Sequence, residues 1–152
     1  MSRPVVIAYD GSEDASAAVR EAGRLFPGQP AVVLTVWESV AGLAGGARAA
    51  LPAAVVAEAL VALDQSAQEE AEKTAADGAR IAGDAGLDAT SFAAKAAHNV
   101  WSTILSEAEG RDAGVVVVGS RGRSPVRAAV LGSVSNSITA NSRLPVLVVR
   151  AG

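Results

Sequence analysis

Four short runs of continuous apolar residues constrain the fold of this chain more than any other feature. Their sequences are VVIAY, AVVLTV, GVVVVG and PVLVVR, at Val5–Tyr9, Ala31–Val36, Gly114–Gly119 and Pro145–Arg150. Continuous apolar runs of this length are typical of strands that are covered on both faces, whereas half-exposed strands alternate. A weakly alternating stretch, Ala89–Ala96, predicts a further strand near a sheet edge.

Helical patterns separate the runs. Apolar residues repeat at three and four over Asp14–Phe26, and a long Ala- and Glu-rich helix is expected from about Ala54 to Ala85. Asn99 can cap a helix that continues through Glu109, and a short helix is expected from about Ser133 to Asn141. This alternation predicts an α/β fold, with a parallel sheet and helices on both faces, in one domain over residues 1–152. The segment from Trp37 to Ala57 is the least regular part.

Composition excludes several classes of protein. The chain of 152 residues contains no cysteine, so disulfides, thiolate metal sites and cysteine nucleophiles are excluded. A formal charge of −3 argues against a general nucleic-acid binder. The first apolar run stops at Asp10, and no run has the length of a membrane span. We therefore expect a cytoplasmic protein that binds neither nucleic acid nor membrane.

A glycine-rich segment follows the strand expected at Gly114–Gly119. Gly119 ends that strand, Gly122 follows, and Gly132 precedes Ser133, where the next helix is expected to open. The first N–H groups of a helix have no partner within the helix and attract anions, and glycine lets the backbone approach a ligand. Hydroxyl groups and positive charge lie in the same segment, on Ser133, Ser135, Arg121, Arg123 and Arg127. The pattern predicts an anion or nucleotide site, although glycines in a plain strand-to-helix connector remain the alternative.

The segment differs from the better-known phosphate loops. A Walker loop ends in Gly-Lys-Ser/Thr, and this segment contains no lysine. The dinucleotide fingerprint requires a third glycine three residues after the second, and that position is Pro125.

The chain resembles the universal stress protein family nearly from end to end. The pattern Gly-x2-Gly-x9-Gly-Ser is similar to the ATP-binding signature of that family, and VVIAYDGSEDASAAVREA resembles its opening strand, turn and helix. The resemblance implies a five-stranded parallel sheet in the order 3-2-1-4-5, like that of adenine-nucleotide alpha-hydrolases. In that order the carboxyl ends of strands 1 and 4 flank a topological switch point, where α/β sheets bind ligands.

The resemblance also implies roles for individual residues. Asp10 would lie near the ribose hydroxyls or a magnesium ion carried by ATP, although it could instead cap the following helix. Val36 would contact the adenine. The full set of implied nucleotide-binding residues is Ala8, Tyr9, Asp10, Val36, Gly119, Arg121, Gly122, Gly132, Ser133, Val134 and Ser135.

The family resemblance leaves three functions open. The first is a nucleotide-responsive regulatory protein of the stress response that binds ATP with little or no hydrolysis, because the residues offer no evident catalytic base. The second is a dimeric interaction module that binds AMP or cyclic AMP. The third is a weak ATPase. An apolar strand at the sheet edge invites pairing with another chain, so a homodimer through Pro145 to Val149 is expected.

Overall fold

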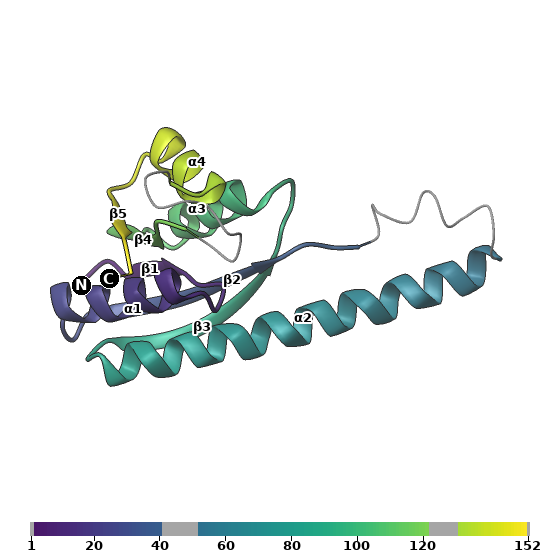
Figure 1. The fold of residues 1–152 in the computed structure, drawn as a ribbon, viewed down its shortest axis with the longest axis horizontal. Helices are drawn as coiled ribbons and strands as arrows, with labels where there is room; N and C mark the ends of the chain where they lie inside the picture. The colour runs from purple at the N-terminus through teal and green to yellow at the C-terminus, as the bar shows by residue number, and fades with distance from the viewer. Residues whose placement is uncertain (1, 41–51, 122–130, 152) are drawn as a thin grey trace.

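The computed structural model describes residues 2–40, 52–121 and 131–151, and Figure 1 shows their arrangement. Nine elements alternate along these residues, as the sequence predicted. The strands are β1 (Val5–Ala8), β2 (Pro30–Trp37), β3 (Asp88–Lys95), β4 (Val115–Gly119) and β5 (Val146–Val149). The helices are α1 (Glu13–Leu25), α2 (Ala53–Asp84), α3 (Val100–Gly110) and α4 (Ser133–Asn141).

The five strands form one parallel sheet in the order β3-β2-β1-β4-β5. The expected fold class and strand order are therefore confirmed. β1 lies at the centre, with β2 on one side and β4 on the other. The chain leaves β1 in one direction and later returns to its other side, so the carboxyl ends of β1 and β4 meet at the switch point.

Successive residues of the central strands point to opposite faces of the sheet, and each face carries its own apolar cluster. Ile7 and Val117 belong to the cluster that α1 and the end of α2 cover. Val6 and Val116 belong to the cluster on the other face, which α3 and α4 cover through Ile104, Leu105 and Ile138. Burial on both faces explains why these strands read as continuous apolar runs.

Only the second half of α2 lies against the sheet. Its buried positions include Ala71, Ala75 and Gly78, and Figure 1 shows its first half projecting past the sheet. At Gly78 a Cβ would lie 2.7 Å from ring carbon Cδ2 of Tyr9, so glycine permits the close approach of this helix to the sheet. In the projecting half, Val61 and Leu63 are more than half exposed.

Several sequence predictions fall partly or wholly outside the described residues. These are most of the irregular segment within Trp37–Ala57, together with Gly122, Arg123 and Arg127. Within the described ranges, no helix offers a stretch that is both long and apolar enough to span a bilayer.

Candidate nucleotide site

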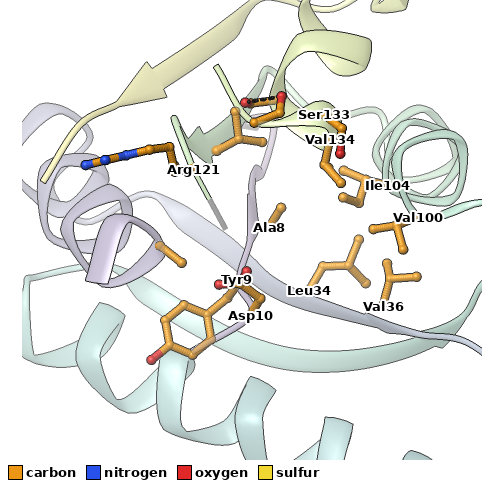
Figure 2. Close-up of a pocket in the computed structure, with 15 residues that line it drawn as sticks. Ala8, Tyr9, Asp10, Leu34, Val36, Val100, Ile104, Arg121, Ser133 and Val134 are labelled. Carbon is orange, nitrogen blue, oxygen red and sulfur yellow. Dashed lines mark hydrogen bonds between the residues drawn. The ribbon is translucent and has the colours of Figure 1, made fainter. Parts of the chain in front are cut away.

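A pocket of about 390 Å³ opens at the carboxyl ends of β1 and β4, beside the first turn of α4 (Figure 2). This volume lies within the range of small-molecule sites. Ten of the eleven residues predicted for the site line this one pocket: Ala8, Tyr9, Asp10, Val36, Gly119, Arg121, Gly132, Ser133, Val134 and Ser135. The eleventh, Gly122, lies outside the described residues.

One end of the pocket is apolar. Leu34 and Val36 come from β2, Val100 and Ile104 from α3, and Val118 from β4. Figure 2 shows the side chains of Leu34, Val36, Val100 and Ile104 gathered on one side of the pocket. A flat aromatic group would bury its faces against this surface. The sequence analysis found Val36 alone of these residues, because an apolar residue that lines a pocket reads the same as one in a core.

The other end of the pocket is the first turn of α4. Gly132 occupies the N-cap position, and being glycine it offers no side chain to cap the helix; no other described side chain caps it. The N–H groups of Ser133, Val134 and Ser135 belong to the first turn, where a helix offers them no carbonyl partner. By contrast, Ser12 caps α1 through the N–H of Ala15 at 3.1 Å, and Asn99 caps α3 through that of Ser102 at 2.9 Å.

The hydroxyl of Ser135 lies differently from the role expected for it. It is buried, and its Oγ lies 2.9 Å from the carbonyl oxygen of Ser120 and 3.0 Å from that of Gly132. The hydroxyl proton is therefore directed to the protein backbone. Ser133 is exposed, so its hydroxyl is the more accessible one in this turn.

Asp10 and Tyr9 border the pocket at the end of β1. Oδ1 of Asp10 accepts a hydrogen bond from the N–H of Ser12 at 2.9 Å, while Ser12 itself is the N-cap of α1. The alternative that Asp10 caps this helix is therefore wrong, because Asp10 instead stabilises the turn before it. The ring of Tyr9 points toward α2 in Figure 2, so Tyr9 borders the site mainly with its backbone.

Among the described residues that line the pocket, Asp10 is the single candidate ligand for a magnesium ion. The described residues contain no cluster of three or more His, Asp or Glu side chains suited to a metal. Mg²⁺ needs few protein ligands when the substrate's phosphates and water complete its shell. Asp10 fits that limited role, since the described residues donate to its Oδ1 only.

Arg121 lies at the pocket, but its guanidinium is directed to a buried carboxylate. Its Nε lies 3.4 Å from Oδ2 of Asp14, and Figure 2 shows the side chain extending away from Val36 and Ile104. Burial alone would raise the pKa of the Asp14 carboxyl. Hydrogen bonds from Ser120, Ala151 and Arg121 outweigh burial and hold that pKa below its ordinary value of 3.8. Asp14 is therefore ionised at neutral pH, and the sequence analysis had read it only as a helix residue.

Gly119 has a steric reason to be glycine. A Cβ at this position would lie 2.7 Å from the carbonyl carbon of Asp14 and 2.9 Å from the backbone nitrogen of Ala15. The first turn of α1 therefore occupies the space that a side chain would need. Close approach of a ligand was the reason expected from the sequence, whereas close approach of the protein's own helix is the one that the geometry gives.

Comparison with known proteins shows the family to which this chain belongs. Residues 1–150 match the family model described as "Usp: Universal stress protein family". A curated relative from Thermus aquaticus, "Universal stress protein in QAH/OAS sulfhydrylase 3'region", is 32% identical over 99% of this chain and 100% of its own length. The chain belongs to the universal stress protein family. The fold of this universal stress protein is also similar to that of hypothetical protein MJ0577, with a TM-score of 0.77, 21% identity and coverage of 100% and 98% of the two chains.

Two further similar structures are complexes with a nucleotide. One is a universal stress protein in complex with cAMP, with a TM-score of 0.64, 21% identity and coverage of 99% and 98%. The other is the universal stress protein from Archaeoglobus fulgidus in complex with dAMP, with a TM-score of 0.62, 22% identity and coverage of 98% of each chain.

Proposed function

We propose that this universal stress protein binds an adenine nucleotide, with ATP as its physiological ligand, and acts as a nucleotide-responsive regulatory protein of the stress response. The observation that carries the proposal is that the two ends of the pocket differ: one end is an apolar surface, and the other is a helix start that no described side chain caps. A nucleotide has the matching distribution, with an aromatic base at one end and anionic phosphates at the other.

The proposal assigns each part of the nucleotide to a part of the pocket. The adenine packs between the residues of β2 and α3, which include Val36. The ribose lies near Asp10, whose carboxylate accepts from its hydroxyls or holds a magnesium ion carried by ATP. The phosphates accept hydrogen bonds from the N–H groups of Ser133–Ser135 and gain from the helix dipole. The backbone of Ala8, Tyr9, Gly119, Arg121 and Gly132 completes the walls.

We infer little or no hydrolysis, because in-line attack on the γ-phosphate needs a group that positions water. Among the described pocket residues, Asp10 has the one carboxylate, and the proposal uses it at the ribose or the metal. AMP and cyclic AMP remain the competing ligands. The complexes of similar proteins with cAMP and dAMP favour an adenine nucleotide as the ligand, but each of those two nucleotides has one phosphate.

A homodimer in the cytoplasm is part of the proposal. β5 lies at the edge of the sheet and pairs on one side with β4. Its other side presents an apolar strand, VLVV, to which the same strand of a second copy can add about a two-fold axis. The absence of cysteine from the sequence is compatible with a reducing compartment.

Calorimetry with ATP, AMP and cyclic AMP tests the proposal. Gly132 is buried at the start of α4, and we expect Gly132→Val to abolish nucleotide binding while the far-ultraviolet circular dichroism spectrum stays native. Gly110→Val, at the end of α3 and with open space around its Cβ position, is the matched control and should bind as the wild type does. Binding by the Gly132 variant at wild-type affinity, or no binding of any of the three nucleotides by the wild type, would reject the proposed site.

A further inference from the structure

A buried carboxylate joins three segments behind the pocket. Asp14 lies in the first turn of α1 and is 5% exposed. Its Oδ2 accepts from the hydroxyl of Ser120 at 2.7 Å and from the backbone N–H of Arg121 at 3.0 Å. Its Oδ1 accepts from the N–H of Ala151, after β5, at 3.2 Å. A buried charge is costly unless it is paired, so these donors offset the desolvation of Asp14.

Ser120 connects Asp14 to the start of α4 through hydrogen bonds. Ser120 is 2% exposed and uses all three of its polar groups. Its hydroxyl donates to Asp14, and its N–H donates to the carbonyl of Val149 at 2.8 Å. Its carbonyl accepts from the N–H of Gly132 at 2.7 Å and from the hydroxyl of Ser135 at 2.9 Å. The first turn of α4 is thus tied to the end of β4 through one backbone carbonyl.

We propose that Asp14 and Ser120 form a positioning pair that fixes the first turn of α4 and thereby sets the affinity of the pocket for the phosphates of its nucleotide. The inference rests on the proposed function. Neither residue lines the pocket, so Ser120 acts through the N–H groups of the α4 turn. Asp14 acts through Ser120 and through Arg121, which lines the pocket and which it also binds. Hydrogen bonds to a charged group depend on alignment, and a displaced turn weakens several of them together.

The pair acts on one end of the ligand only. The apolar end of the pocket is built by β2, α3 and Val118 of β4, and its residues make none of these hydrogen bonds to Asp14 or Ser120. Loosening the pair should therefore weaken ligands that carry phosphate and spare a ligand that carries none. A purely structural role would instead lower stability without changing the preference between such ligands.

Three variants separate these roles. Ser120→Ala removes the hydroxyl and retains both backbone bonds of Ser120, while Asp14→Asn replaces the charge with an amide of similar shape. Ser12→Ala is the matched control, because it removes the N-cap hydroxyl of α1, the helix that also carries Asp14, and lowers stability by a route that does not involve Ser120. Calorimetry gives the dissociation constants for ATP, AMP and adenosine, and thermal melting reports the stability of each variant.

We expect Ser120→Ala and Asp14→Asn to weaken ATP and AMP about tenfold, which corresponds to part of one charge-assisted hydrogen bond. Adenosine should bind within about twofold of wild type, and the control should keep the wild-type ratio. If Asp14→Asn does not fold, Ser120→Ala decides alone. An unchanged ratio of ATP to adenosine affinity in the folded variants would overturn the positioning pair and leave the pocket intact. Failure of the wild type to bind any of the three ligands would instead reject the proposed function.

Discussion

Replacement of Gly119 by alanine separates two reasons for a glycine at the end of β4. If the residue is glycine to admit a ligand, the variant should lose affinity while the unliganded protein keeps its stability. If it is glycine because α1 abuts it, the unliganded protein itself should lose stability. Gly119 is not among the described residues with positive φ, so alanine meets steric contact and no backbone strain.

The size of the effect follows from three contacts. The new Cβ would lie 2.7 Å from the carbonyl carbon of Asp14 and 2.9 Å from both the Asp14 Cβ and the Ala15 nitrogen. Unstrained carbon contacts lie at about 3.5–4.0 Å, and the nearest atoms are backbone that cannot rotate away. Overpacking of this kind costs about 1–3 kcal/mol, and the backbone contacts place Gly119→Ala near the upper value.

Thermal melting of the ligand-free protein measures this cost. For a chain of this length, about 3 kcal/mol lowers the melting temperature by roughly 6–12 °C. Gly83→Ala in α2 is the matched control, since no atom lies within 4 Å of its Cβ position and alanine favours a helix by up to about 1 kcal/mol. A ligand-free Gly119→Ala protein that melts within about 2 °C of wild type would refute the steric argument.

Two further predictions concern the sheet edge and the segment after β2. Along β5, the carbonyls of Pro145 and Val149 accept from the N–H of Val116 in β4 and of Ser120 directly after it, so the N–H of Val148 faces the free edge. We expect Val148→Pro to be a monomer by light scattering and Val148→Ala to stay dimeric, and a dimeric proline variant would contradict the interface. Asp64 accepts from the hydroxyl of Ser39 at 2.6 Å and the N–H of Val40 at 2.9 Å, and these bonds hold its pKa below the ordinary 3.8. Because the pKa of Asp64 is lower in the folded protein, this contact is present above pH 3.8 and is lost as the pH falls through the pKa of the folded state. The Val40 amide resonance should therefore titrate below pH 3.8 in the wild type, and its midpoint should be higher in Ser39→Ala.

The sequence was sufficient to predict the helices and strands and their order along the chain. Continuous β-branched runs at β1, β2 and β4 left little alternative to buried parallel strands. The nine elements of the described residues lie where apolar patterns, caps and breakers in the sequence predicted them. The order of strands in the sheet came from the family resemblance, because apolar runs do not specify which strand lies beside which. The structure confirms that order.

The site was only partly predictable for a physical reason. The switch-point loops contain polar and glycine residues that stand out against apolar strands, so Asp10 and Gly132 could be found. Asp14 could not, because an acidic residue in the first turn of a helix is common and favourable there without any distant partner. Its partner Ser120 lies 106 residues away in the sequence, and no local pattern connects the two. Ile104 likewise reads as a core residue whether it packs on a side chain or on a ligand.

These contacts change what the glycine pattern itself can indicate. Gly119 is constrained by the backbone of Asp14 and Ala15, so the position would resist substitution even in a chain whose pocket were empty. The pattern is therefore a sign of how α1 meets β4 as well as of a ligand. Two features of the described residues bear on nucleotide binding more directly: a helix start without a side-chain cap, and an apolar surface across the pocket from it. Consider a chain that kept the glycines but capped α4 with one of its own side chains, or that placed a larger residue on the surface beside Val36. Such a chain would keep this fold but would not bind a nucleotide in this pocket.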